Sequence, residues 1–281
     1  MIRNPALLEQ LNPMPGDLGP ILNHLPAWLM VLFRLTGIFV LAPLLGSRTV
    51  FRQVKVFLVL GLSLCIYPML LDPANPSAAL VGHVIDGGLS LWTLGAAVGL
   101  ELLVGLIIGY GASLPLVGMQ MGGHVIDQQV GLGIAGVFNP ELGAQSGPLG
   151  EALFLLALTI FTILGGHRVM LSTLIDSFQS VPLGGLTDFG SMIELLLGLL
   201  ASMFEMALRI AAPLLCLIFL ETVAMGFIAR TVPQINILSI GFAVRILMGM
   251  GMMVVLVAVL SGVYVDELQR TLGRLARFFG G

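Results

Sequence analysis

Five ionisable side chains stand inside long apolar stretches of the sequence: Arg34, Glu101, Glu205, Arg209 and Arg245. An ionised group at the centre of a bilayer costs at least about 2.5–3.5 kcal/mol. Glu205 and Arg209 are four residues apart, so in a helix they share one face and can pair. Such charges could line a path for a proton or a solute, or they could form salt bridges buried against partner subunits. The second interpretation is favoured, because no proton-carrier motif accompanies the charges.

The remaining reactive residues show no arrangement typical of an enzyme. The four histidines are scattered without metal-ligand spacing, and His167 and Asp176 share a helix face only poorly. The sequence has no G-x-S-x-G elbow and no phosphate-binding glycine loop. Cys65 and Cys216 stand singly in apolar runs, as small buried side chains do. We therefore expect a non-enzymatic protein without a catalytic, cofactor or metal site.

The composition places these residues in a membrane protein. Of 281 residues, 57% are hydrophobic and only 10% are charged, and the mean hydropathy is +1.05. A soluble domain carries about 25% charged residues, so a water-soluble enzyme is excluded. A net charge of −3 without a basic patch argues against nucleic-acid binding. Glycine is also enriched, at 36 residues.

Six apolar segments predict an all-α protein of membrane-associated helical hairpins, with about six long helices and broken glycine-rich elements. None of them alternates with the period of two that a membrane β-barrel requires. The fifth segment is too long for one span of about 20 residues, and Pro213 is expected to kink or divide it. The segments cover residues 25–45, 54–71, 89–110, 149–164, 192–229 and 235–265.

A glycine-rich stretch at residues 111–148 separates the third and fourth segments and contains no Lys or Arg. It is too apolar for a solvated linker, and its glycines predict that it is too broken for one helix. Irregular backbone at membrane depth is tolerated only inside protein or beside a water-filled cavity. The stretch is therefore a candidate pore or plug element, or a long extramembrane hairpin. Three glycine pairs four residues apart predict close helix packing: Gly95 and Gly99, Gly105 and Gly109, and Gly118 and Gly122.

Basic residues give conflicting indications of topology. By the positive-inside rule, the loop with Arg48, Arg52 and Lys55 lies in the cytoplasm. Five crossings then place the basic C-terminal residues outside, where the rule does not expect them. Either one apolar segment does not cross the membrane, or the helices are not ordinary lipid-exposed spans.

Three sequence blocks resemble the flagellar biosynthetic protein FliR family. The first reads R-T-V-P-Q-I-N at residues 230–236, followed by Gly241-Phe242. The second reads G-G-H at 165–167 and D-S-F-Q-S-V-P-L-G at 176–184, and the third begins R-L-T-G at 34–37. The blocks occur in the family's order and span about residues 25–265.

The resemblance implies a non-enzymatic subunit of the flagellar type III export gate, which passes unfolded flagellar proteins across the bacterial inner membrane. The expected partners are FliP and FliQ subunits, with FlhB and FlhA nearby, and membrane lipid. Residues 25–190 would be FliP-like, 191–265 a FliQ-like hairpin, and 266–281 a basic tail. The helices would be largely packed on other subunits, which would remove the conflict over topology.

The resemblance also implies two functional segments. A loop at about residues 113–121 would close the channel, with leucines and methionines where relatives have aromatic residues. Apolar side chains at a constriction exclude water and ions. The turn with Arg230, Pro233, Gln234 and Asn236 would lie at the cytoplasmic mouth or contact a partner. The closure residues are Leu114, Leu116, Gly118, Met119 and Met121.

Two other functions stay open at this point. The chain could be the equivalent subunit of a virulence injectisome, although the Pro233-Gln234-Ile-Asn236 turn favours the flagellar reading. It could also be a stand-alone secondary transporter with Glu101, Glu205 and Arg209 as its coupling site. A transporter would be expected to show inverted repeats, and the sequence shows no convincing repeat.

Overall fold

All regular secondary structure that the computed structural model describes is helical. The structure describes residues 19–44, 46, 51–71, 91–132, 147–185, 189–231 and 237–280. Five of the helices are long and apolar enough to cross a membrane, and the bent pair α6–α7 would make a sixth span. The predicted all-α class with about six long apolar helices is thus confirmed. The helices are α1 (Gly19–Leu41), α2 (Arg52–Leu70), α4 (Leu91–Val130), α6 (Pro148–Ile163), α7 (Gly166–Ser180), α8 (Phe189–Thr231) and α9 (Ile237–Gly280).

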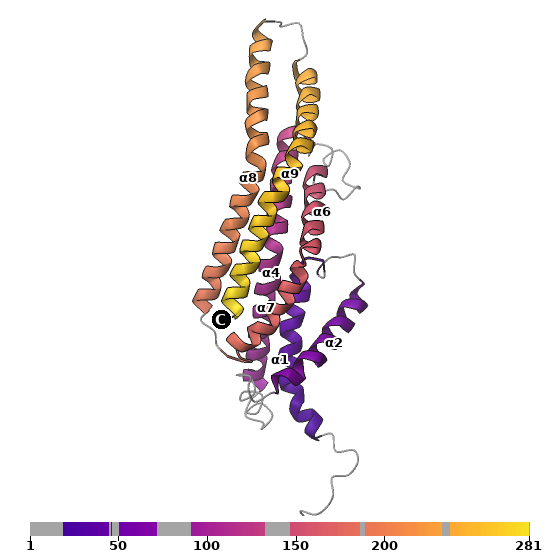
Figure 1. The fold of residues 1–281 in the computed structure, drawn as a ribbon, viewed down its shortest axis with the longest axis vertical. Coiled ribbons are helices and arrows are strands. Elements are labelled where there is room, and N and C mark those ends of the chain that lie inside the picture. The colour runs from indigo at the N-terminus through magenta and orange to yellow at the C-terminus, as the bar shows by residue number, and fades with distance from the viewer. Residues whose placement is uncertain are drawn as a thin grey trace, which may run out of the picture.

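The helices form an elongated bundle around α4, which contacts α1, α6, α7, α8 and α9 (Figure 1). α4 has 40 residues, so at 1.5 Å per residue it is about 60 Å long. The antiparallel helices α8 and α9 lie along α4 and project beyond the other helices at the top of Figure 1. α2 packs on α1 and diverges from the bundle. Segments far apart in the sequence therefore meet on α4.

Glycines allow α1 and α4 to cross at very short distance. A Cβ atom on Gly109 would lie 2.8 Å from the Ile38 carbonyl oxygen, and one on Gly105 would overlap the Arg34 carbonyl oxygen. Added Cβ atoms on Gly118 and Gly122 would similarly press on α8. Two of the three predicted glycine pairs thus mark close helix packing. The third pair does not, because an added Cβ on Gly95 or Gly99 meets nothing within 4 Å.

The prediction that residues 111–148 are too broken for one helix is wrong for their first half. Residues 111–130 continue α4 without interruption, and residues 133–146 lie outside the described residues. Glycine destabilises a helix in isolation, but here the missing side chains let other helices approach. Gly118 packs on Met203, Gly122 on Ala207 and Gly123 on the Gly150 backbone. Close packing therefore offsets the low helix propensity of this stretch.

Asp127 of α4 forms hydrogen bonds with the N-terminus of α6. Its side chain is fully buried, and its carboxylate accepts hydrogen bonds from the Leu149 N–H at 3.1 Å and the Gly150 N–H at 2.8 Å. The first N–H groups of a helix lack partners within the helix, and a carboxylate also suits the positive end of the helix dipole. Asp127 thus caps α6 from another helix.

Besides α4, two further helices differ from the predicted segments, and one helix was missed. The fifth segment was expected to be kinked or divided at Pro213, and it is not divided, because α8 is one helix that contains Pro213. The last helix continues past residue 265 to Gly280 rather than ending before a tail. α7 was not predicted as an apolar segment, because polar and apolar residues alternate along its sequence. It follows α6 after a 64° bend at Gly165, which has a φ of +70°.

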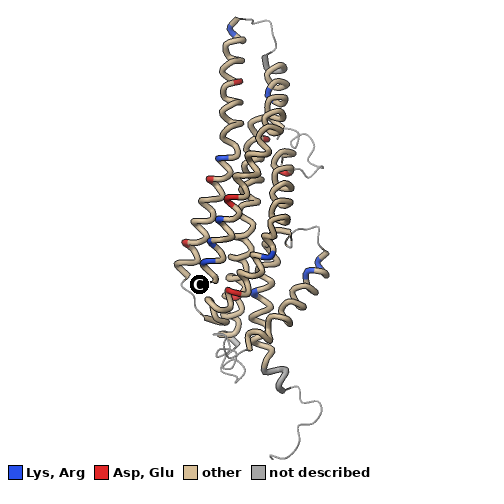
Figure 2. Tube along the Cα trace, in the orientation of Figure 1, with Lys and Arg blue, Asp and Glu red and all other residues tan. Residues whose placement is uncertain are grey.

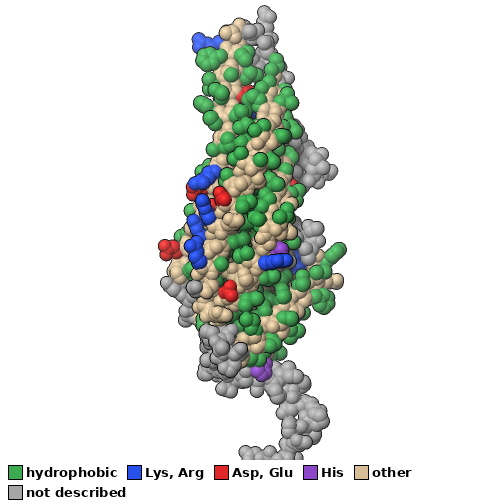
Figure 3. Space-filling view, viewed as in Figure 1, with side chains coloured by type: hydrophobic (Ala, Val, Ile, Leu, Met, Phe, Trp, Pro, Cys, Tyr) green, Lys and Arg blue, Asp and Glu red, His purple; other side chains and the backbone are tan. Residues whose placement is uncertain are grey.

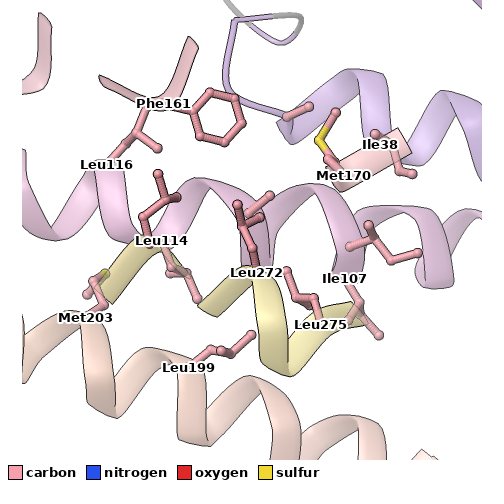
Figure 4. Packing of buried hydrophobic residues seen from close by; sticks show 14 of the residues in the cluster. Ile38, Ile107, Leu114, Leu116, Phe161, Met170, Leu199, Met203, Leu272 and Leu275 are labelled. Atoms are coloured by element: carbon pink, nitrogen blue, oxygen red, sulfur yellow. The ribbon is translucent and has the colours of Figure 1, made fainter. Parts of the chain in front are cut away.

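The core lies around α4, where α1, α6, α7, α8 and the lower part of α9 pack together. Figure 4 shows Leu114 and Leu116 of α4 among side chains of the neighbouring helices. Phe161 of α6 and Leu275 of α9 are almost fully buried in the same cluster. The Ser180 hydroxyl also donates a hydrogen bond to the Phe279 carbonyl at 2.5 Å. The C-terminal residues of the described chain are therefore part of the packed body.

Candidate functional site: a buried polar cluster and the α8–α9 hairpin

Arg34 is the largest fully buried charged side chain in the described structure. Its Nε donates to the Glu101 carboxylate, and its Nη1 and Nη2 donate to the carbonyl oxygens of Ser177 and Val181, both at 3.0 Å. The guanidinium carbon also lies 4.3 Å from the centre of the Phe178 ring, as in a cation–π contact. The planar guanidinium thus joins α1, α4 and the end of α7.

Glu101 completes this cluster from the other side. Its second carboxylate oxygen accepts a hydrogen bond from the Gly184 N–H at 2.9 Å. Gly184 has a φ of +68°, a conformation that glycine adopts without steric cost. Two of the sequence blocks that carry the family resemblance, at 34–37 and 176–184, therefore meet around one ion pair. The cluster holds the end of α7 and the residues that follow it up to Gly184.

Glu205 and Arg209 form the predicted i,i+4 pair, at 2.5 Å, on the surface of α8. Their side chains are 63% and 60% exposed, so burial of this pair would require another subunit. The pair forms no site with Glu101, which bonds to Arg34 and Gly184 instead. The coupling site of the transporter alternative is therefore not assembled in the described part of the chain.

Arg245 of α9 pairs with Glu221 of α8, which sequence reasoning missed. The Arg245 Nη2 lies 3.1 Å from both the Glu221 carboxylate and the Thr222 hydroxyl. Glu221 is only 6% exposed, although the surrounding surface of the hairpin is apolar. The sequence did offer a sign of this pair, because Glu221 is an acidic residue within the apolar run 210–229. The pair joins α8 and α9 near the end of the hairpin that projects beyond the bundle.

The segment predicted as a closure loop is helical. Residues 113–121 lie in the middle of α4, so the loop conformation is wrong. Leu114, Leu116 and Met119 are at most 1% exposed, because neighbouring helices cover them. Gly118 lies against Met203. Met121 alone of the five predicted closure residues has a clearly exposed side chain, at 38%.

The predicted cytoplasmic turn is described only at its first residue. Arg230 is exposed in the last turn of α8. Pro233, Gln234 and Asn236 lie outside the described residues. The described part of the chain contains no group of three His, Cys, Asp or Glu side chains that could hold a metal ion.

The long apolar helices, joined by ion pairs between helices, define a polytopic helical membrane protein. Comparison with known proteins identifies the protein family. The sequence pattern of the family described as "Bacterial export proteins, family 1" matches residues 25–271. The chain belongs to this family.

Individual relatives agree with the family match. The chain is 28% identical over 246 residues to "Flagellar biosynthetic protein FliR" of Bacillus subtilis (strain 168), covering 86% of this chain and 90% of the relative. It is 28% identical over 250 residues to the protein of the same name from Escherichia coli (strain K12), covering 85% and 87%. It is 27% identical over 230 residues to "Yop proteins translocation protein T" of Yersinia pestis, covering 80% and 83%.

Proposed function

We propose that this chain is a non-enzymatic subunit of the flagellar type III protein export gate in the bacterial inner membrane. It helps to form and close the channel for unfolded flagellar proteins and is needed for flagellum assembly. The observation that carries this proposal is the family match over residues 25–271, together with relatives named for flagellar biosynthesis. The absence of an assembled coupling site in the described residues agrees with a channel component rather than a stand-alone transporter.

The length of the exposed apolar surface supports a hetero-oligomeric gate. Large exposed apolar side chains follow α8 from Phe189 to Ile228, which is about 58 Å of helix at 1.5 Å per residue. The hydrocarbon core of a bilayer is only about 30 Å thick, and helix tilts rarely exceed about 40°. Lipid therefore cannot cover the whole face. The remainder fits contact with FliP-type and FliQ-type subunits, with FlhB and FlhA nearby.

The arrangement of the helices supports a division of the chain into a FliP-like part, about 25–190, and a FliQ-like hairpin, about 191–265. α8 and α9 form one antiparallel hairpin, and the remaining helices precede it in the sequence. Residues 266–280 lie within α9, which runs to Gly280, so the basic residues of the proposed tail at 266–281 would extend the hairpin. Arg230, at the end of α8, fits the proposed partner-contact turn with Pro233, Gln234 and Asn236.

Closure of the channel would involve only one face of α4. Met121 and Val117 are one turn apart, and they are 38% and 37% exposed. Leu114, Leu116 and Met119 would act indirectly, by holding α4 in place within the subunit. We assign the channel-facing part of the closure segment to the Val117–Met121 face, where apolar side chains would exclude water and ions.

Polar substitutions test the closure assignment without deleting part of a helix. Val117→Ser with Met121→Ser should make the assembled gate leak ions, measured as conductance in planar bilayers. Leu103→Ser is the matched control, because Leu103 is similarly exposed on the same helix, at 42%. Unchanged conductance in the double variant, or an equal leak in the control, would show that the Val117–Met121 segment does not close the channel.

Deletion of the gene tests the function as a whole. The deletion strain should neither swim nor secrete flagellar proteins into the medium, and the intact gene should restore both. Normal swimming would overturn the flagellar function. The likeness to a Yersinia translocation protein favours one second candidate, the equivalent subunit of an injectisome. In that case the deletion strain would swim but would lose secretion of another set of proteins.

A further inference from the structure

Charged side chains gather on one part of the α8–α9 hairpin. The two helices carry them where they lie beside the bundle, whereas their projecting ends are mostly apolar (Figures 2 and 3). The side chain of Arg270 is 61% exposed, and those of Glu205 and Arg209 are 63% and 60% exposed. We call this surface the charged band. It consists of Glu205 and Arg209 of α8 and Asp266, Glu267, Arg270 and Arg274 of α9.

Neither lipid nor water suits this surface as a whole. Exposed ionised groups are strongly unfavourable in hydrocarbon. Large apolar side chains lie within and beside the band, however, and a broad apolar surface is unfavourable in water. Phe204 is 49% exposed, Leu208 64% and Val259 59%. A protein surface that offers both apolar and charged groups matches this mixture, as the buried cores and polar rims of protein interfaces do.

A cavity within the band contains groups that the chain itself does not satisfy. Its volume is about 110 Å³, and all six residues of the band line it. The Glu267 Oε1 atom is buried and has no hydrogen-bond partner among the described residues. The other oxygen of the same carboxylate lies 4.0 Å from the Arg270 Nη1, beyond hydrogen-bond distance. Asp266 lies beside it with an exposed side chain. The cavity thus offers carboxylate oxygens that lack strong donors.

Arg270 lies 4.0 Å from the Glu267 carboxylate, and the other two arginines that line the cavity are already engaged. Arg209 is paired with Glu205 at 2.5 Å, and Arg274 donates a hydrogen bond to the Ser202 hydroxyl at 2.8 Å. The space beside Glu267 and Asp266 is large enough for an ammonium or guanidinium group. A donor from outside the chain would supply the missing hydrogen bonds, and a charge-assisted bond is the strong type.

We propose that the charged band is a docking surface for a transmembrane helix of a neighbouring gate subunit. That helix carries a Lys or Arg whose head group enters the cavity and binds Glu267 and Asp266, and apolar side chains that cover Phe204, Leu208 and Val259. This inference rests on the proposed function, because it names a contact surface of the same assembly. Electrostatic pairing of this kind sets the register and the choice of partner more than it sets affinity.

Removal of the two carboxylates tests the pairing. In the full chain, Asp266→Asn with Glu267→Gln should leave folding intact, because the Glu267 carboxylate has only a weak partner within the chain. Co-expressed with the FliP-type and FliQ-type subunits of the same organism, the variant should enter the complex at least about tenfold less than the natural chain, since an unpaired partner cation opposes docking. The measurement is the amount of tagged chain in the complex on native gels.

Glu151→Gln is the matched control, because Glu151 is an exposed carboxylate on α6, outside the band. It should assemble like the natural chain. Full assembly of the double variant, or an equal loss in the control, would overturn the docking surface. If the natural chain itself fails to join such a complex, the proposed function is wrong, and the two failures are therefore distinguishable.

Chemical labelling decides the question independently of stability. Cys65 and Cys216 are exposed rather than buried as the sequence suggested, so both are replaced by serine. In that chain, Arg270→Cys should react with a membrane-impermeant maleimide in the isolated subunit and be protected about tenfold in the complex. Equal labelling in both states would mean that the band faces water. No labelling in either state would mean that lipid or detergent covers it. A subunit that pairs through the band with a second copy of itself, without other subunits, would also overturn the proposal.

Discussion

The Arg34 guanidinium and the Glu101 carboxylate form a buried ion pair between α1 and α4, and their side chains are 0% and 3% exposed. The pair also satisfies backbone groups of the turn after α7, at Ser177, Val181 and Gly184. Three segments separated by up to 147 residues therefore depend on two side chains. Because each charge is desolvated, loss of one partner leaves the other buried without compensation.

We expect Arg34→Met and Glu101→Gln each to destabilise the subunit by about 3–5 kcal/mol, the usual cost of breaking a buried pair. The combination Arg34→Met with Glu101→Leu should be less damaging than Arg34→Met alone, because it leaves no unpaired charge, but it should remain destabilising, because the backbone groups at Ser177, Val181 and Gly184 lose their partners. Thermal unfolding of the purified subunit in detergent measures the order of the three variants. Single variants that unfold at the natural temperature would show that the pair does not hold the turn.

α4 contains glycines that are packed against another helix, such as Gly105, and glycines with open space beside them, such as Gly95. Substitution by alanine should have opposite effects on stability at the two kinds of position. Gly105→Ala should separate α1 from α4 and lower the unfolding temperature, since the new Cβ would overlap the Arg34 carbonyl oxygen. Gly95→Ala should raise helix stability by up to about 1 kcal/mol, because its Cβ meets nothing within 4 Å. Unfolding midpoints of both variants provide the measurement. A neutral Gly105→Ala would contradict the close crossing.

The cap of α6 by Asp127 can be tested in the same way. Asp127→Ala should cost about 1–3 kcal/mol, because the N–H groups of Leu149 and Gly150 lose a buried acceptor. Asp127→Asn should cost less, since one side-chain oxygen can still accept a hydrogen bond. Hydrogen exchange at the amides of residues 149 and 150 measures the effect locally. Unchanged exchange in Asp127→Ala would show that these amides have other partners.

Apolar patterning was sufficient to predict the fold class and the apolar segments, but it misjudged the glycine-rich stretch. Gly118 and Gly122 read as helix breakers because the sequence does not show which helix will approach them. α7 was missed because more exposed polar residues such as Ser172 and Asp176 alternate with its buried residues along the sequence, so no continuous apolar run marks it. Packing between distant segments cannot be read from a local pattern.

The candidate site was predicted in parts. The charges of Arg34 and Glu101 were recognised as unusual within apolar segments, yet their pairing depends on the crossing of α1 and α4. Glu221 was overlooked even though it stands in an apolar run, and Arg245 was left without a partner. Ion pairs between helices follow from register, and sequence spacing determines register only within one helix, as for Glu205 and Arg209.

The docking of the C-terminal end of α9 is the last feature that a direct experiment can test. A Cβ atom on Gly280 would lie 3.9 Å from the Asp176 Cβ, within the usual range of about 3.5–4.5 Å for disulfides. In a chain with Cys65 and Cys216 replaced by serine, Asp176→Cys with Gly280→Cys should therefore form an internal disulfide under mild oxidation, detected by mass spectrometry. Asp176→Cys with Gly273→Cys should not, because the Cβ of residue 273 meets nothing within 4 Å. Failure of the first pair to cross-link would mean that residues 266–280 do not pack on α7 but behave as a separate basic tail.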